Sequence, residues 1–319
     1  MKIPILMYHY VRPSHRRLSS RHNVLDLELY DQQLNALAAN HSFILGRDLV
    51  GETKGIVFEQ RNIWLTFDDG YRDCVEYALP SLLRNGATAT FYIPTEAIFN
   101  RKLLDVNKIH ILLSSHFTPT EIVEFSRRSF DDLKIEVAIG QTFDELFTKN
   151  GIENLWNDKD TEFIKKLFQK LLPAKLRKQL LERVFNQLVD RSESSWVDEF
   201  YMTPDDLQRL VDNGMEVGSH GHSHEWLGEM STDAQEDEIT RSFELLSSIN
   251  NSFEFKTICY PFGSYNDETI RILRNQKVCT GVLNRRQSYA QVEPDVADHL
   301  ELDRIDVMFF DKFMNGEFQ

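Results

Sequence analysis

The chain has 319 residues, of which 41% are hydrophobic and 27% charged, the composition of an ordinary globular protein. Its 50 acidic side chains outnumber 36 basic ones, giving a formal net charge of -14. This excess argues against nucleic acid or an anionic membrane as a partner, because phosphate binding needs positive charge. The apolar start, up to His9, is too short for a membrane span or a signal peptide. The three scattered cysteines form no disulfide or zinc pattern, so we expect a soluble cytoplasmic protein.

Six short apolar segments are typical of buried strands, and each ends at a polar or glycine-containing stretch. Helical patterns separate them, which favours an α/β domain with a largely parallel sheet or barrel. In such folds the functional groups follow the strand ends. In chain order, the predicted strands are 5–8, 62–67, 87–93, 215–219, 256–260 and 278–283.

The segment from about 103 to 195 is different, because it is strongly charged and has few strand signals. It contains an apolar stripe with helical spacing over 176–188. We therefore expect a helical insertion within a single domain that spans 1–319. After it, capping residues predict helices that begin at Thr203, at Ser231 or Thr232, and at Asn266.

Two adjacent carboxylates, Asp68 and Asp69, follow the predicted strand 62–67 and precede Gly70. At a strand end both can reach one cleft, and their repulsion is relieved if one binds a cation while the other acts as a base. Asp-Asp-Gly also suits a simple turn, which is the alternative interpretation.

Three histidines lie within five residues directly after the predicted strand 215–219. His220 and His224 are four residues apart, so one helical turn would place both imidazoles on one side, as a metal site requires. His222 would point elsewhere, and an exposed histidine-rich loop is the alternative. With the Asp68–Asp69 pair, two histidines and a carboxylate make the ligand set of a catalytic metal ion, beside a second carboxylate that can accept a proton from water.

Two further strand ends carry candidate groups. Tyr260-Pro261-Phe262-Gly263 predicts a tight turn whose backbone N–H groups suit an oxyanion, although an ordinary strand-to-helix loop has the same pattern. His9 ends the first predicted strand, and a histidine suits the proton donor that a hydrolase needs for its leaving group. Trp226 is the tryptophan best placed to stack on a sugar ring, because it lies two residues after His224.

These motifs resemble the polysaccharide deacetylase family, also called the NodB-homology domain or carbohydrate esterase family four. Residues 66–70 match its first motif, 219–224 its second, and 260–263 resemble its third, whereas 103–195 has no counterpart. The resemblance implies an α/β fold, a distorted (β/α) barrel with a helical insertion. It also implies that Asp68 is the general base, that Asp69, His220 and His224 hold a divalent metal, and that the Phe262 N–H helps to bind the oxyanion.

The third motif departs from the family pattern. It lacks the arginine that normally precedes its proline and steadies the base, and the chain has Cys259-Tyr260 there. Arg304 is our candidate for that role, with Asp303 or Asp306 as the candidate acid of the fourth motif.

The general acid is also displaced from its usual place. It is ordinarily a histidine near the C-terminus, and none follows His299. Some members are circularly permuted and open with a Leu-Met-Tyr-His strand like this one. We therefore expect His9 to be the relocated acid, with His299 as its competitor.

The resemblance implies a metal-dependent hydrolase that removes an N-acyl group from an amino-sugar. Acetyl is the favoured acyl group, and the amino-sugar would belong to a polysaccharide, glycolipid or nucleotide-sugar. Two imidazoles and a carboxylate suit one zinc ion, with cobalt, nickel or iron as alternatives. A deformylase or a non-sugar amidase on the same scaffold stays open, as does a catalytically degenerate carbohydrate-binding protein. The sequence leaves the sugar, the acyl group and the oligomeric state open.

Overall fold

The computed structural model describes residues 2–16, 24–50, 61–154, 157–249, 255–292 and 298–318. The chain divides into two compact units. The first comprises Met1–Arg16, Val24–Lys102 and Val197–Gln319, and the second is built on Leu103–Trp196.

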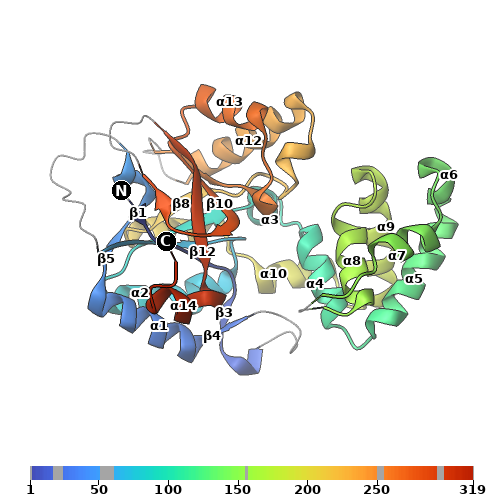
Figure 1. Ribbon diagram of the computed structural model, residues 1–319, viewed down its shortest axis with the longest axis horizontal. Helices are drawn as coiled ribbons and strands as arrows, with labels where there is room; N and C mark the ends of the chain where they lie inside the picture. Colours follow the sequence, from blue (N-terminus) through green and yellow to red (C-terminus); the bar gives the residue numbers. More distant parts are fainter. Residues whose placement is uncertain are drawn as a thin grey trace. The chain divides into compact units, whose positions relative to one another are not determined.

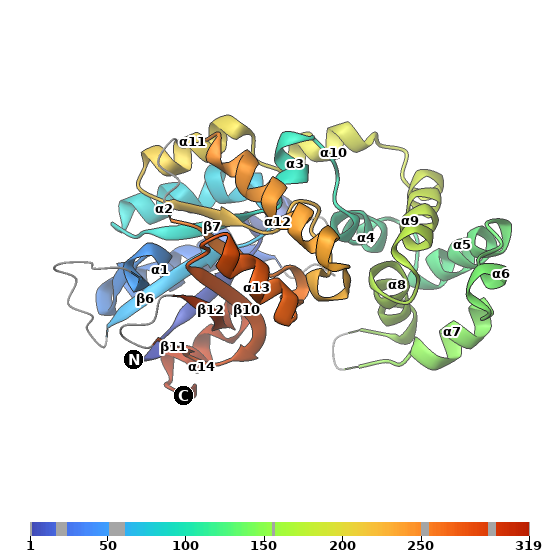
Figure 2. The same cartoon turned by 90° about the horizontal axis from the view of Figure 1, so that it is seen from above.

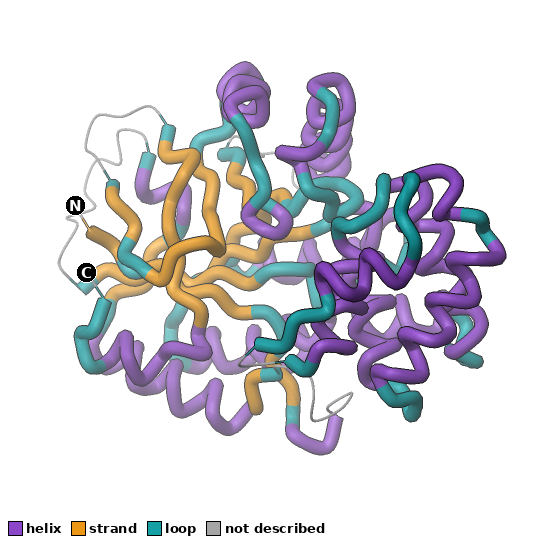
Figure 3. Tube along the Cα trace, turned by 45° about the vertical axis from the view of Figure 1, so that its right-hand side comes forward, coloured by secondary structure: helices purple, strands orange, loops and turns teal. Residues whose placement is uncertain are grey.

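Seven parallel strands close into a barrel in the first unit (Figure 3). Their order is β2, β12, β10, β9, β8, β7 and β6, and β6 pairs back with β2, while β5 extends the sheet beside β6. This architecture confirms the predicted (β/α) barrel. The strands are β2 (Ile5–Tyr8), β5 (Ser42–Ile44), β6 (Asn62–Phe67), β7 (Ala89–Ile93), β8 (Glu216–Ser219), β9 (Thr257–Cys259), β10 (Thr280–Gln287) and β12 (His299–Asp306).

All six predicted strands are present, and β2 and β6 have the predicted bounds. The prediction missed β5 and β12, together with four two-residue strands. β12 carries charged residues at four of its eight positions, so its pattern is that of a surface segment. The short strands are β1 (Lys2–Ile3), β3 (Val11–Arg12), β4 (Leu25–Asp26) and β11 (Ala290–Gln291).

Helices cover the outside of the barrel, with α12 and α13 side by side (Figures 1 and 2). The predicted caps are confirmed, since Thr203, Ser231 and Asn266 each accept a backbone N–H with the side chain. A cluster that includes Ile239, Phe243 and Ile272 packs these two helices against the strands. The helices of this unit are α1 (Leu27–Asn40), α2 (Leu79–Arg84), α3 (Thr95–Phe99), α11 (Pro204–Asp212), α12 (Thr232–Ser247), α13 (Asp267–Asn275) and α14 (Phe310–Met314).

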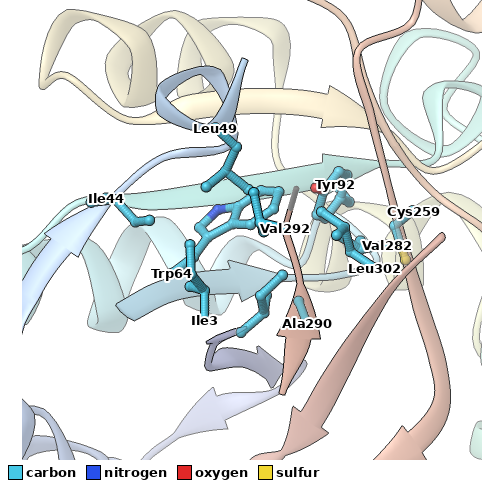
Figure 4. Packing of buried hydrophobic residues seen from close by; sticks show 11 residues of the cluster. Ile3, Ile44, Leu49, Trp64, Tyr92, Cys259, Val282, Ala290, Val292 and Leu302 are labelled. Atoms are coloured by element: carbon cyan, nitrogen blue, oxygen red, sulfur yellow. The ribbon is translucent and has the colours of Figure 1, made fainter. Parts of the chain in front are cut away.

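The barrel interior holds an apolar cluster, buried polar contacts such as Trp64–Thr90 and Tyr92–Thr257, and charged groups near the carboxyl ends of the strands. Trp64, Tyr92 and Leu302 belong to a buried cluster drawn from many of the strands (Figure 4). Successive inward positions of a strand are two residues apart, so Thr66 and Arg304 follow Trp64 and Leu302 toward the carboxyl end. Arg304 Nη1 donates to Thr66 Oγ1 at 3.0 Å, which shows that these two side chains meet inside.

The described residues of the second unit form helices and no strand. Its apolar stripe lies on α9, where Leu180, Leu181 and Val184 are buried. Among the described residues, no helix of either unit is long and apolar enough to cross a membrane. The helices here are α4 (Asp105–Ser114), α5 (Pro119–Asp132), α6 (Ile135–Ile139), α7 (Phe143–Asn150), α8 (Lys159–Gln169) and α9 (Ala174–Leu188), and α10 (Glu193–Phe200) continues into the first unit.

Candidate active site

The candidate residues from distant parts of the sequence meet at the carboxyl end of the barrel. His9 directly follows β2, the Asp68–Asp69 pair follows β6, and His220 follows β8, while Arg304 lies near the end of β12. Since all these strands are parallel, their carboxyl ends share one rim. The barrel therefore collects these side chains in one place.

Asp69, His220 and His224 form a buried group that fits a divalent metal. Asp69 Oδ1 lies 3.3 Å from His220 Nε2 and 3.4 Å from His224 Nε2. The three candidate ligand atoms lie within 4.8 Å of one another. His220 Nδ1 lies 2.8 Å from the carbonyl oxygen of Cys259 and donates to it, so in the neutral ring Nε2 carries the lone pair for a ligand bond. Two imidazoles and one carboxylate are a donor set for catalytic zinc and similar ions.

The charges of this group are set by its own contacts. Burial alone would raise the pKa of Asp69, but hydrogen bonds from His220 and His224 hold that pKa well below its usual range. Burial alone would lower the pKa of His220, but Cys259 and Asp69 outweigh it and raise that pKa well above the usual value. Asp69 is therefore ionised, and the group favours a bound positive charge, either a proton on His220 or a metal ion in its place.

The two histidines reach one side by a route that differs from the prediction. Residues 220–224 form a loop and not a helical turn. Gly221 and His224 both adopt left-handed backbone angles, with φ of 72° and 58°. These reversals bring the two imidazole rings to a centroid distance of 4.7 Å. His222 lies outside the metal group, and its Nδ1 is 2.9 Å from Thr95 Oγ1.

Asp68 lies beside the candidate metal group (Asp69, His220 and His224) and accepts two hydrogen bonds from Arg304. Arg304 Nη1 donates to Oδ1 at 2.8 Å and Nη2 to Oδ2 at 2.7 Å, while Nε donates to the Leu283 carbonyl oxygen at 2.8 Å. Burial alone would raise the pKa of Asp68, but the guanidinium outweighs it and lowers that pKa below its usual range. Asp68 is therefore an ionised carboxylate held in one orientation.

Cys259 is a residue of this site that the sequence did not reveal. Its thiol donates to Asp68 Oδ2 at 3.4 Å and accepts from Arg304 Nη2 at 3.0 Å. The guanidinium thus reaches Asp68 beside β9, the strand on which the family motif normally carries its arginine. The two acids near Arg304 have other contacts, since Asp303 accepts from Ser288 Oγ and Asp306 caps the turn at Val307–Phe309.

The two candidate acid histidines lie at opposite ends of the barrel. His9 Nε2 is 3.8 Å from Asp68 Oδ2, and the His9 side chain is 38% exposed. His299 is the first residue of β12 and pairs with Thr280, the first residue of β10. It therefore lies at the amino end, away from Asp68, so His9 is the histidine that the structure brings to the site.

Phe262 lies beside His224, the second histidine of the candidate metal group. It occupies the turn η5 (Pro261–Gly263) with a left-handed φ of 55°. Its ring contacts the His224 ring at a centroid distance of 4.7 Å and stacks on Trp226 at 4.4 Å. The turn predicted from Pro261 and Gly263 thus borders the metal group, together with Trp226.

A parallel barrel with ionised side chains collected at the carboxyl rim is the arrangement of (β/α)-barrel enzymes. The sequence profile described as polysaccharide deacetylase matches residues 56–110 and 184–280. The chain belongs to the polysaccharide deacetylase family. A comparison with curated proteins finds no match.

Solved structures share the fold over nearly the whole chain. The Streptococcus pyogenes deacetylase PplD in complex with acetate is 18% identical, with a TM-score of 0.56 over 99% of this chain and 97% of its own. IcaB from Ammonifex degensii is 15% identical, with a TM-score of 0.57 over 98% of this chain and 96% of its own. A de-N-acetylase from Aggregatibacter actinomycetemcomitans is 12% identical, with a TM-score of 0.54 over 96% of this chain and 94% of its own.

Proposed function

We propose that this chain is a metal-dependent N-deacetylase that hydrolyses the acetamide group of an amino-sugar. One observation carries the proposal: a carboxylate–histidine group that fits a metal adjoins Asp68, an ionised carboxylate that lies 3.8 Å from His9. Hydrolysis of an amide needs an activated carbonyl, a base for the water and an acid for the leaving amine. The site offers a residue for each of these tasks.

Asp69, His220 and His224 would hold the ion. When bound, a divalent ion at these residues supplies Lewis-acid activation of the amide carbonyl and of the attacking water. Asp68 accepts a proton from that water as its oxygen bonds to the acyl carbon. Arg304 keeps Asp68 ionised and fixed in orientation, so the base is ready before substrate arrives.

His9 donates a proton to the nitrogen as the carbon–nitrogen bond breaks, so the products are acetate and a free amine. Its partly exposed side chain beside Asp68 suits contact with a substrate. The backbone N–H of Phe262 binds the carbonyl oxygen, on which negative charge develops.

An acetylated glycan is the substrate class that best fits the chain. Family membership supports a carbohydrate, and a similar fold has been solved with acetate, the expected product. The net charge of -14 disfavours an anionic nucleotide-sugar. We therefore propose a neutral or amine-bearing amino-sugar polymer.

The test is product release by chelator-stripped protein reloaded with zinc or cobalt. The substrates are N-acetylglucosamine oligomers, the monosaccharide, its nucleotide-linked form, an N-formyl peptide and an aryl acetamide. We expect acetate from the oligomers, with kcat lowered about 10²- to 10⁴-fold in Asp68→Asn. The exposed Asp131→Asn is the matched control and should be fully active. Release from the peptide or the aryl amide alone would replace the proposal with an amidase, and bound metal without any turnover would indicate a degenerate binding protein.

A further inference from the structure

The loop that carries both histidines has a backbone that needs external support. Gly221 and His224 lie in the left-handed region, and for a side chain like that of His224 this conformation is unfavourable in isolation. Such conformations persist where surrounding contacts impose them. The question is which contacts hold residues 220–224 in the shape that brings the two imidazoles together.

Glu238 of α12 supplies the contacts on one side of the loop. Its carboxylate accepts the backbone N–H of Ser223, and the Ser223 hydroxyl lies 3.0 Å from each carboxylate oxygen. A Cβ at Gly221 would lie 3.2 Å from Glu238 Oε1, so the same carboxylate also packs against the first part of the loop. Glu238 is 6% exposed, and its position is therefore fixed by the helix and the loop.

A second contact from the same helix lies one turn further along. Ser242 Oγ is 2.6 Å from Ser219 Oγ, which accepts the backbone N–H of Gly221 at 3.0 Å. Residues four apart on a helix share one face, so Glu238 and Ser242 act on the loop together. A further helix, α3, also holds the loop, since the backbone N–H groups of Thr95 and Glu96 donate to the carbonyl oxygens of Gly221 and His222.

We propose that Glu238 is a positioning residue that imposes the metal-binding conformation on the loop 220–224. This inference rests on the metal centre of the proposed function. Glu238 binds neither the metal nor the substrate. It acts through Ser223, the residue next to His224, and so sets where the second imidazole lies. Glu238 lies outside the family motifs that the sequence matches, and it is 15 residues from Ser223 in the sequence.

The test is the affinity of the stripped protein for cobalt, measured by competition with a chelator and by the cobalt absorption bands. Loss of an outer partner of a metal ligand costs about 10- to 100-fold in affinity. We expect that loss in Glu238→Ala, with altered cobalt bands. Glu238→Gln keeps a side-chain oxygen for the Ser223 N–H and should restore most of the affinity. Glu236→Ala, on the exposed face of the same helix, is the matched control and should bind as the wild type does.

Wild-type affinity and unchanged cobalt bands in Glu238→Ala would overturn the proposal, as would an equal loss in Glu236→Ala. If Glu238→Ala does not fold, Ser223→Ala provides the test, because it removes only the hydroxyl contacts to the carboxylate. We expect a several-fold weaker affinity there, and wild-type affinity would again overturn the proposal. Because cobalt binding needs no substrate, failure to release acetate would contradict the proposed function and leave this result unaffected.

Discussion

Arg304 on β12 donates two hydrogen bonds to Asp68, a residue 236 positions earlier in the chain, at 2.8 and 2.7 Å. The pair is buried, and Cys259 lies against both partners. The small thiol on β9 leaves room for a guanidinium that arrives from another strand. Asp68 is thus held by Arg304, whereas the third motif of the family carries its arginine before the proline.

Arg304→Leu should impair both stability and turnover. Removing one partner of a buried ion pair leaves the other charge unpaired, at a cost of about 3–5 kcal/mol. We expect a lower melting temperature and a large loss of kcat, since Asp68 loses its orientation. Arg304→Lys keeps the charge without the two parallel hydrogen bonds and should be intermediate. Full kcat in Arg304→Leu would contradict this account of Asp68.

His9→Ala should lower kcat about 10²- to 10⁴-fold, because the leaving amine loses its proton donor. His299→Ala is the control, since His299 lies at the amino end of the barrel. We expect that variant to keep its kcat, although the loss of a buried ring can lower its melting temperature. Steady-state kinetics of the two variants decide between the residues, and the opposite pattern would make His299 the acid.

His224→Ala should abolish stable metal binding, because it removes one of the three side chains proposed to hold the ion. Elemental analysis of the purified wild type should find about one divalent ion per chain. The exposed His116→Ala, in the helical unit, should keep that ion. Undiminished metal in His224→Ala would place the ion elsewhere.

Asp73 gives the protein a pH-dependent stability that can be measured. Burial raises its pKa to about 6, even though Arg12 Nε lies 2.5 Å from its Oδ2. The folded state therefore binds a proton more tightly than the unfolded state, whose Asp pKa is about 4. The stabilisation that comes from this tighter proton binding is fully present below about pH 4 and is lost as the pH rises through about 6.

Asp73→Asn removes this titration. Relative to the variant, the wild type should lose up to about 3 kcal/mol of unfolding free energy between pH 4 and 7. Urea unfolding of both proteins at several pH values measures the difference. A difference that stays constant with pH would show that Asp73 does not titrate in this range.

Local patterns predicted much of the barrel and of the metal group. Uninterrupted apolar runs defined β2 and β6, and capping residues such as Thr203 defined helix starts, because both signals act over a few residues. The roles that the resemblance gives to Asp68 and Phe262 stay predictions, but the geometry brings those residues to one rim.

The features that local patterns did not predict depend on contacts between residues far apart in the sequence. Arg304 lies in a segment rich in charge, and its burial is explained by partners distant in the sequence, above all Asp68. Glu238 stands in a run of acidic residues on α12 that is typical of a solvent-exposed face, and only Ser223 distinguishes it. The spacing of His220 and His224 predicted a helical turn, because spacing alone does not reveal left-handed residues.

Hydrolysis by this chain should depend on an ion held by Asp69, His220 and His224. The most direct measurement is the rate of acetate release from an N-acetylglucosamine oligomer while stripped protein is titrated with zinc or cobalt. We expect no release without metal and a rate that rises to a plateau at about one ion per chain. Undiminished release by the fully stripped protein would contradict this expectation.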